Sequence, residues 1–359
     1  MITLSLCMIV KNEEDVLERC LASAYTLFDE IVIVDTGSND KTKEIAQKYT
    51  NNVYDFVWCD DFSKARNYAI EKCTKKYFMW LDADDVITKE ELIKLKKLKE
   101  EITEDIDIVM INYAISFDSE NKPDFEYYRE RIVKNNGKFL FCDPVHEVIP
   151  TSGKIIFKDI TIEHRKIKEN KKQRNLKIYE KLKRKQKLSP RQQFYYSREL
   201  YYNNKIDKAI LNLKKFLKDK DGFYENKIDA CNILSKCYIS KNETQKAKEI
   251  LFHSFSYDLP RAEILCNIGY LYQNEYDYVK SIYYFNLALN SKYTKENFSF
   301  NKPQYYNYIP ALELCVCYYN LKDYNKSYFY NSLAKATNPN DEIVLKNEQI
   351  LTKILEKTL

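Results

Sequence analysis

Glycine is scarce in this sequence of 359 residues, with only 5 copies, whereas tyrosine occurs 31 times. So little glycine excludes a collagen-like chain, and the ordinary apolar content excludes a chain that is too polar to fold. No apolar run reaches the roughly 18 residues that a membrane-spanning helix requires. The first residues lack the basic start and cleavage site of a signal peptide, which predicts a cytoplasmic protein. The length allows two domains, each with its own core.

Histidine and paired cysteines are rare as well. The 3 histidines, His146, His164 and His253, are too few for a zinc site built from histidine. The 10 cysteines are scattered without a CxxC pair, so we expect reduced thiols that fill the core. A bound metal would therefore be a cation that prefers oxygen ligands, such as Mg2+ or Mn2+. For His253, packing within a helix is the expected role.

Charge is divided unevenly along the chain. Residues 1–165 hold 23 Lys+Arg against 32 Asp+Glu, whereas residues 166–359 hold 35 against 21. The stretch 166–188 alone contributes a net charge of +9. The acidic first half, and the lack of a basic motif interleaved with aromatics, argue against nucleic-acid binding. Two interpretations of 166–188 stay open: a linking helix with a solvated basic face, or a site that attracts phosphates or an acidic partner.

The amino-terminal part alternates between two periodicities. Continuous apolar runs, typical of parallel strands covered on both faces, lie at 4–10, 30–36, 52–58, 76–82 and 106–112. Helical patterns lie at 13–27, 39–49, 63–74 and 88–101. Ser63 and Thr88 are the expected caps of the last two, and Glu91 would complete a capping box. This order predicts an α/β domain with a Rossmann-like, mostly parallel sheet, whose ligands bind at the carboxyl ends of the strands.

From residue 189 onward the strand pattern disappears and a helical repeat begins. Small residues recur at spacings of 38, 34 and 46, namely at Ala209, Ala247, Ser281 and Ser327. Twelve positions before each of them lies another small residue, in the order Ser197, Ser235, Gly269 and Cys315. Small residues where two helices cross predict stacked helical hairpins. We attribute the longest spacing to an insertion around 291–305, and we expect a last helix at 341–357 to cap the stack.

Polar clusters follow the predicted strands. They are Asn12-Glu13, Asp35 to Ser38, Asp60-Asp61, Asp82 to Asp85, and Asp143 to Glu147. Carboxylates that repel one another cost stability unless a cation lies among them. The DxD spacing places Asp82 and Asp84 on the same side of an extended chain. We therefore expect a divalent cation at one edge of the sheet.

Segments around these clusters resemble a known family. "LCMIVKNEE", "IVIVDTGSNDKTKEIA", "DDFSKARNYA" and "FMWLDADD" are similar to the signature segments of family 2 glycosyltransferases with the GT-A fold. "DPVHEVI" and "IEHRKIKENKKQRNLKIYEK" narrow the resemblance to the bacterial branch with tetratricopeptide repeats, which includes the sublancin S-glycosyltransferase. The resemblance implies a GT-A domain at 1–165, a basic linking helix at 166–188 and a tetratricopeptide-repeat-like domain at 189–359.

The resemblance also implies the metal ligands. Asp84 would coordinate the cation, Asp82 would reach the ribose, or the metal through water, and His164 would be a third protein ligand. For Asp85 we expect a different role, as the cap of the following helix.

Residues after the earlier strands would hold the nucleotide sugar. The backbone up to Val10 would form the base pocket with Glu13, and Asp35 would contact the base or the ribose. Asp61 and Arg66 share the segment "DDFSKARNYA", where Arg66 would reach the pyrophosphate or fix the base-binding acids.

Some of these assignments leave alternatives open. Arg66 could instead be a surface arginine paired with Asp61, and Lys64 is expected to face solvent. Arg131 resembles the family arginine that precedes the HE segment, and we group it with the nucleotide-sugar-binding residues.

The HE segment is the candidate for acid–base chemistry. An inverting transfer needs a base near the acceptor nucleophile. Glu147 is the expected base, with His146 orienting it or contacting the donor phosphate. The sequence shows no clear ED acid pair in this region, unlike many family 2 members, and a purely structural role for both residues stays open.

The sequence thus predicts a metal-dependent, inverting glycosyltransferase that takes a sugar from a nucleoside-diphosphate donor, expected to be UDP-linked. The repeats would recognise a peptide or protein acceptor, because helical-repeat grooves suit extended chains, and a homodimer is compatible with their tyrosine-rich surface. One alternative is transfer to a lipid- or wall-linked glycan, with 166–188 on an anionic membrane surface, although that stretch has few apolar residues. Another is a repeat scaffold with an inactive transferase domain.

Overall fold

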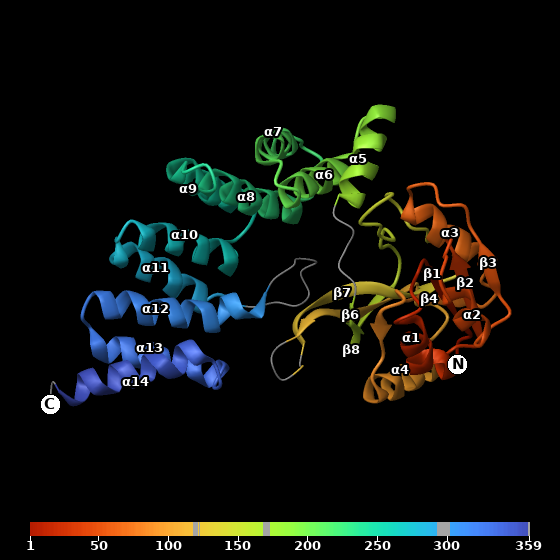
Figure 1. Cartoon of the computed structure of the whole chain (residues 1–359), viewed down its shortest axis with the longest axis horizontal. Helices are drawn as coiled ribbons and strands as arrows, with labels where there is room; N and C mark the ends of the chain where they lie inside the picture. The colour runs from red at the N-terminus through yellow and green to blue at the C-terminus, as the bar shows by residue number, and fades with distance from the viewer. Residues whose placement is uncertain (118–120, 122, 168–172, 293–301, 358–359) are drawn as a thin grey trace. The chain divides into compact units, whose positions relative to one another are not determined.

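The computed structural model describes residues 1–117, 121, 123–167, 173–292 and 302–357, and forms two compact units, Met1–Lys187 and Leu188–Leu359 (Figure 1). The insertion predicted around 291–305 lies mostly outside the described residues. Within the described part of the chain, no helix is long and apolar enough to cross a membrane. The domain limits drawn from the sequence stay a prediction.

The first unit contains an eight-stranded sheet with the strand order β3-β2-β1-β4-β7-β6-β8-β5. The strands are β1 (Leu4–Val10), β2 (Glu30–Asp35), β3 (Val53–Asp55), β4 (Tyr77–Trp80), β5 (Asp85–Val86), β6 (Ile108–Phe117), β7 (Pro123–Lys134) and β8 (Ile155–His164). β3, β2, β1 and β4 run parallel to one another, and β6 is parallel to β8. The predicted α/β class with a mostly parallel sheet is confirmed, and β1 has the predicted bounds. The predicted strand 106–112 lies largely within β6, but antiparallel β7 separates it from β4.

Apolar side chains cover both faces of the parallel strands. On one face, Leu4, Leu6 and Met8 of β1 belong to a core that includes residues of α1 (Leu17–Ala24), α2 (Thr42–Gln47) and α4 (Lys89–Glu101). On the other face, Cys7 belongs to a core with residues of α3 (Phe62–Lys72). Successive side chains of a strand alternate between its faces, so β1 is anchored in both cores and its carboxyl end is held firmly.

The helix starts differ from the predictions in detail. α3 begins at Phe62, and its N-cap is Asp61, whose side chain accepts from the backbone N of Lys64 at 3.1 Å. Thr88 caps α4 as predicted, but Glu91 does not close a capping box. Its carboxylate instead accepts from the backbone N of Thr161 at 2.9 Å, because β8 packs beside α4.

The second unit is helical throughout the residues that the structure describes, apart from short turns (Figure 1). Its α-helices are α6 (Pro190–Tyr202), α7 (Ile206–Leu217), α8 (Tyr224–Ile239), α9 (Thr244–His253), α10 (Ala262–Asn274), α11 (Tyr278–Leu289), α12 (Tyr308–Asn320), α13 (Tyr324–Thr337) and α14 (Glu342–Glu356). Consecutive pairs from α6–α7 to α12–α13 pack as hairpins, and α14 packs on α13. The predicted tetratricopeptide-like architecture is therefore confirmed.

The predicted crossing points hold these hairpins together. All four small positions from Ala209 to Ser327 are completely buried. Ser281 Oγ donates to the carbonyl of Gly269 at 2.9 Å, and Ser327 Oγ donates to that of Cys315 at 2.8 Å. Residues twelve positions apart in the sequence therefore meet where the helices cross.

The cysteines behave as core residues. All ten are free thiols, and eight of them are buried, whereas Cys59 and Cys142 are exposed. The prediction of reduced thiols in the core is confirmed for these eight.

Candidate functional site at the strand ends

The carboxyl ends of β1, β2 and β4 lie together at one edge of the parallel strands. The register pairs Val10 with Asp35 across β1 and β2, and Cys7 with Trp80 across β1 and β4. Asp82 follows β4 by two residues, so the acidic turn after β4 begins beside the end of β1. The clusters after the first, second and fourth predicted strands thus share one edge of the sheet.

The loop after β2 folds around the buried Asp35 carboxylate. Oδ2 of Asp35 accepts from the backbone N of Gly37 at 3.1 Å and of Ser38 at 2.9 Å. Gly37 has a φ of +99°, which favours glycine at this turn. Beside this loop, the backbone N of Glu13 donates to Thr42 Oγ1 at 2.7 Å. Val10 and Glu13 therefore lie near Asp35, as a shared nucleotide pocket requires, although the Asp35 carboxylate is engaged by its own loop.

A tight turn after β4 places its three carboxylates at different depths. The backbone N of Asp82 donates to Asp85 Oδ2 at 2.9 Å, and the backbone N of Asp85 donates to the carbonyl of Asp82 at 3.0 Å. The Asp85 side chain is completely buried, whereas those of Asp82 and Asp84 are 29% and 21% exposed. The prediction that Asp85 caps α4 is wrong, because Thr88 does so and the Asp85 carboxylate points into the turn.

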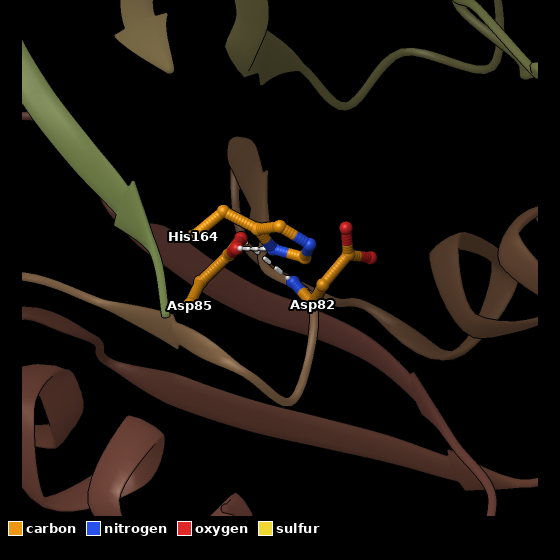
Figure 2. A group of neighbouring side chains, drawn as sticks. All are labelled: Asp82, Asp85 and His164. Carbon is orange, nitrogen blue, oxygen red and sulfur yellow. Dashed lines mark hydrogen bonds and ion pairs between the residues drawn. The ribbon is translucent and has the colours of Figure 1, made fainter. Parts of the chain in front are cut away.

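His164 reaches this turn from the end of β8. β5 pairs antiparallel with β8 and places Asp85 opposite His164 (Figure 2). His164 Nδ1 lies 3.1 Å from Asp85 Oδ1 and 3.3 Å from Asp84 Oδ1. Possible ligand atoms of Asp82, Asp85 and His164 lie within 4.8 Å of one another. The structure therefore brings the three predicted metal ligands, Asp82, Asp84 and His164, to one place, together with Asp85.

Burial and neighbouring charges shift the pKa values in this cluster. Burial raises the pKa of Asp84, and the Asp82 and Asp85 carboxylates raise it further against the opposing effect of His164. Burial also opposes ionisation of Asp82, but Arg66 and then Arg131 outweigh it and hold the pKa of Asp82 well below its usual range. Burial lowers the pKa of His164, but Asp85, Asp84 and Asp82 together raise it above its ordinary value.

These residues fit a divalent cation. Carboxylate oxygens with one imidazole are ligands that Mn2+ and Mg2+ accept. The partly exposed Asp84 carboxylate is disfavoured by burial and by its acidic neighbours, and a cation would relieve both effects.

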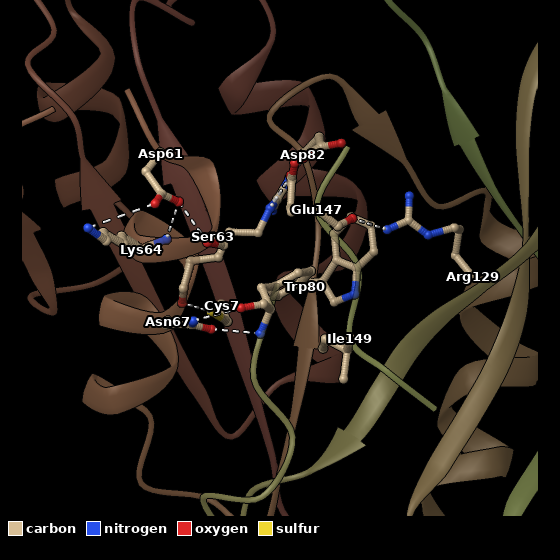
Figure 3. Close-up of polar contacts among 12 residues, drawn as sticks. Cys7, Asp61, Ser63, Lys64, Asn67, Trp80, Asp82, Arg129, Glu147 and Ile149 are labelled. Atoms are coloured by element: carbon tan, nitrogen blue, oxygen red, sulfur yellow. Dashed lines mark hydrogen bonds and ion pairs between the residues drawn. The ribbon is translucent and has the colours of Figure 1, made fainter. Parts of the chain in front are cut away.

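Arg66 connects the acidic turn to the HE segment. Its Nη2 donates to Asp82 Oδ1 at 2.7 Å, and its Nε donates to Glu147 Oε1 at 2.8 Å. The two carboxylates, Asp82 and Glu147, are labelled in Figure 3. The arginine is buried, so the alternative of a surface arginine paired with Asp61 is wrong. Asp61 instead binds within α3, to Ser63 Oγ at 2.6 Å, and Lys64 is exposed as predicted.

Three guanidinium groups surround the indole of Trp80. The Cζ atoms of Arg66, Arg129 and Arg131 lie 4.8, 4.7 and 3.7 Å from the ring centroid. Arg131 is completely buried and donates from Nη1 to Asp85 Oδ2 at 3.1 Å and to the Trp80 carbonyl at 2.9 Å. The prediction that Arg131 contacts the nucleotide sugar is therefore corrected, because this side chain supports the acidic turn from beneath.

The HE segment is fixed to the sheet and to two helices. Asn67 of α3 forms a reciprocal pair of hydrogen bonds with the backbone of Phe141, at 3.0 and 2.8 Å. Tyr179 Oη donates to the Val145 carbonyl at 3.1 Å, and its ring stacks on that of His146. His146 has a φ of +55°, so the chain turns sharply just before Glu147. Glu147 thus faces Arg66 and Asp82, whereas His146 lies against Tyr179.

The basic stretch forms α5 (Arg174–Lys185), which belongs to the first unit. The stretch has few apolar residues, as noted from the sequence, but Leu176, Ile178 and Tyr179 of α5 are buried. Lys181 pairs with Asp60 at 2.5 Å, in the loop after β3. His253, in the second unit, is exposed at the end of α9, and its Nε2 lies 3.0 Å from the Tyr257 hydroxyl, so the predicted packing role is limited to this contact.

Sequence reasoning missed the residues beneath the site. Tyr113, Arg129 and Glu130 come from β6 and β7 and complete its hydrogen bonding. Glu130 is buried and accepts from Arg129, and burial alone would raise the pKa of Glu130, but Arg129 lowers it overall. The alternating charges of "YYRERIVK" are the one signal that could have indicated paired buried ions there.

The comparison with protein families places a known domain over the first unit. Residues 5–165 match the family described as Glycosyl transferase family 2. A TPR repeat-containing protein of Synechococcus elongatus is 33% identical over 153 residues, which cover 42% of this chain and 36% of that protein. The prophage-derived glycosyltransferase SunS of Bacillus subtilis is 32% identical over 149 residues, covering 40% of this chain and 34% of SunS. The matches thus span about a third of the length of these two relatives.

Two further likenesses are weaker. The lipopolysaccharide core biosynthesis glycosyltransferase LpsC of Rhizobium meliloti is 26% identical over 188 residues, covering 47% of this chain and 68% of LpsC. Among solved structures, S. aureus TarS aligns with a TM-score of 0.38 and 15% identity, over 68% of this chain and 55% of TarS.

Proposed function

We propose that the family 2 glycosyltransferase domain formed by residues 5–165 transfers a sugar, with inversion, from a nucleoside-diphosphate donor to a peptide or protein side chain. The observation that carries this proposal is the meeting of Asp82, Asp84 and His164 at the strand ends, with Arg66 joining Asp82 to Glu147. The expected donor is UDP-linked.

Asp84, Asp82 and His164 would hold a Mn2+ or Mg2+ ion at this edge. When bound, such a cation neutralises charge on the departing diphosphate. Arg66 keeps the Asp82 carboxylate ionised and aimed at the edge, because its guanidinium binds Oδ1. Val10, Glu13 and Asp35 would line the nucleotide pocket, and Asp61 would order the start of α3 beside it.

Glu147 is the proposed base. Glu147 and Asp82 both accept hydrogen bonds from Arg66. The residue that would take the acceptor proton is therefore linked through Arg66 to the acidic turn after β4. His146 positions Glu147 through the sharp backbone turn at φ +55° and its stacking on Tyr179.

The second unit supports a peptide or protein acceptor. Its stacked hairpins present the kind of extended helical surface that binds extended chains. The similarity to SunS, a glycosyltransferase whose match covers a third of its length, is compatible with this choice.

A glycan acceptor is the second candidate. It is favoured by the similarity to LpsC, which is named for lipopolysaccharide core biosynthesis and is covered over 68% of its length. Tyr179 of α5 is buried and donates to the Val145 carbonyl within the first unit, so α5 does not offer this side chain to a membrane.

UDP release by the 359-residue chain tests the proposal. The protein is incubated with UDP-glucose or UDP-N-acetylglucosamine, in Mn2+ or in EDTA. We expect release that requires the metal and that Asp84→Asn reduces about 100-fold or more. Lys64→Ala, an exposed change at the same edge, is the matched control and should retain activity.

The same reactions distinguish the acceptors. Peptide mixtures and lipid-linked glycans are offered separately, and mass spectrometry detects the added sugar. Sugar on peptide supports the first candidate, and sugar on glycan alone supports the second. Nucleotide release that Asp84→Asn leaves unchanged, or no nucleotide binding at all, would favour a non-catalytic scaffold.

A further inference from the structure

The ring nitrogen Nδ1 of His164 is surrounded by oxygen atoms. Tyr113 Oη lies 2.7 Å away, Asp85 Oδ1 lies 3.1 Å away and Asp84 Oδ1 lies 3.3 Å away. Ionised carboxylates only accept hydrogen bonds, so an unprotonated Nδ1 would place its lone pair against theirs. The proton of a neutral His164 therefore belongs on Nδ1, and Nε2 keeps the lone pair that can bind a metal.

Asp85 is held too deeply to bind an ion itself. Its side chain is completely buried. Its Oδ2 accepts from Arg131 Nη1 at 3.1 Å and from the Asp82 backbone N at 2.9 Å. Oδ1 accepts from the Tyr113 hydroxyl at 2.8 Å. With both oxygens engaged beneath the turn, Asp85 can act on a cation only through the residues that it orients.

We infer that Asp85 is the positioning residue of the metal site: its carboxylate fixes the proton of His164 on Nδ1 and the backbone of Asp82 in the turn. One buried carboxylate thereby orients two of the three ligands. Histidines that bind metals generally donate their other N–H to a carboxylate or carbonyl in this way. The inference rests on the metal site of the proposed function, but the tautomer of His164 is a property of the metal-free chain.

Asp85→Asn is the decisive substitution because it preserves size and replaces the acceptor Oδ1, which faces His164 and Tyr113, by a donor. The new amide oxygen can still accept from Arg131 and from the Asp82 backbone. The amide nitrogen then faces His164 and donates to Nδ1, which moves the ring proton to Nε2 and blocks that ligand.

Two measurements on the 359-residue chain, after EDTA treatment, test this expectation. The first is 15N NMR of histidine-labelled protein at alkaline pH, where the ring is neutral. Only 3 histidines contribute, and His146→Gln and His253→Gln identify the signals. The second is Mn2+ affinity, measured by electron paramagnetic resonance of the free ion.

We expect the wild-type His164 to carry its proton on Nδ1. Asp85→Asn should move it to Nε2 and weaken Mn2+ binding by about tenfold to 100-fold. Asp84→Asn, the matched control, should also weaken Mn2+ binding but leave the proton of His164 on Nδ1, because Asp85 is intact.

The outcomes separate this inference from the proposed function. A wild-type His164 protonated on Nε2 overturns the inference, even if Asp85→Asn fails to fold. Mn2+ affinity of folded Asp85→Asn within twofold of wild type overturns it as well. Wild-type protein with Nδ1 protonated but no Mn2+ binding would contradict the metal site of the proposed function and leave the orientation of His164 by Asp85 standing.

Discussion

The two units of this chain are held together by different interactions. At the centre of the first unit, buried charges are paired: Arg131 of β7 with Asp85 of β5, and Glu130 with its neighbour Arg129 on β7. At the helix crossings of the second unit, neutral small residues meet, as Ser281 does with Gly269. Buried ion pairs contribute little net stability but become costly when one partner is removed. The first unit therefore depends on charge compensation where the site lies, and the second depends on close packing.

The chain offers a way to observe each unit separately. Both tryptophans, Trp58 and Trp80, lie in the first unit, so their fluorescence reports its unfolding alone. Far-UV circular dichroism at helical wavelengths is dominated by the second unit, which contains most of the described helices.

The largest expected effect comes from breaking a buried ion pair. Arg131→Met leaves Asp85 without its cation and should lower the free energy of unfolding of the first unit by about 3–5 kcal/mol. Urea unfolding followed by tryptophan fluorescence measures this loss, and the helical transition should be unchanged. The double variant Arg131→Met/Asp85→Asn removes both charges and should be less destabilised than the single one. Equal loss in both variants would show that charge compensation is not the reason.

The second unit should respond to volume instead. A Cβ at Gly269 would lie 2.9 Å from the Phe285 ring, which is completely buried. Gly269→Ala should therefore cost the second unit about 1–3 kcal/mol through overpacking, seen in the circular dichroism transition. Adding Phe285→Leu makes room and should recover part of the loss. A neutral effect of Gly269→Ala would contradict the close packing of Gly269 on Phe285 as a source of stability.

Acid should affect the two units in opposite directions at two carboxyl groups. Burial raises the pKa of Glu313 and outweighs its hydrogen bonds with Gln273 and Tyr270, which lower it. The contribution of Glu313 to stability therefore rises as the pH falls through that raised value. Arg129 outweighs burial and lowers the pKa of Glu130, so its contribution persists at mildly acidic pH and is lost only below about pH 4. As the pH falls from neutral towards the ordinary pKa of a glutamate, about 4.3, the second unit should therefore gain stability from Glu313. Glu313→Gln should remove this gain, and an unchanged pH dependence in that variant would contradict the assignment.

The smallest expected effect is at an exposed charge. Lys64 lies on α3 near buried Arg66, but its side chain is 70% exposed and 3.9 Å from Asp61. Lys64→Ala should change the free energy of unfolding of the first unit by less than about 0.5 kcal/mol. A larger loss in the tryptophan fluorescence transition would show that exposed charges also hold this unit together.

The sequence predicted the parts of the fold that depend on local pattern. The apolar run 4–10 matched β1, and the small positions of the repeat matched the helix crossings. Both features could be predicted because hydrophobic periodicity and side-chain size are properties of short stretches of sequence. β7 was not predicted, since "EYYRERIVK" has the charges of an exposed segment. Arg131 is nevertheless buried, because its partner Asp85 lies 46 residues away in the sequence.

The same limit applied to the site. Carboxylates after the strand ends could be predicted to gather, because parallel strands end at one edge. The sequence could not predict which of these carboxylates are available to a metal ion and which support the turn from below, because that depends on how deeply each side chain is buried in the turn. Asp84 and Asp85 are adjacent in the sequence, yet one is partly exposed and the other completely buried.

Arg66 donates one hydrogen bond to Asp82 and another to Glu147, and this arrangement has a consequence for kinetics. The same guanidinium orients Asp82, next to the proposed metal site, and Glu147, the proposed base. A substitution of either carboxylate therefore also removes a constraint on the position of the other. Rate losses from Asp82 and Glu147 variants should then overlap instead of multiplying, and the pair would behave as one kinetic element.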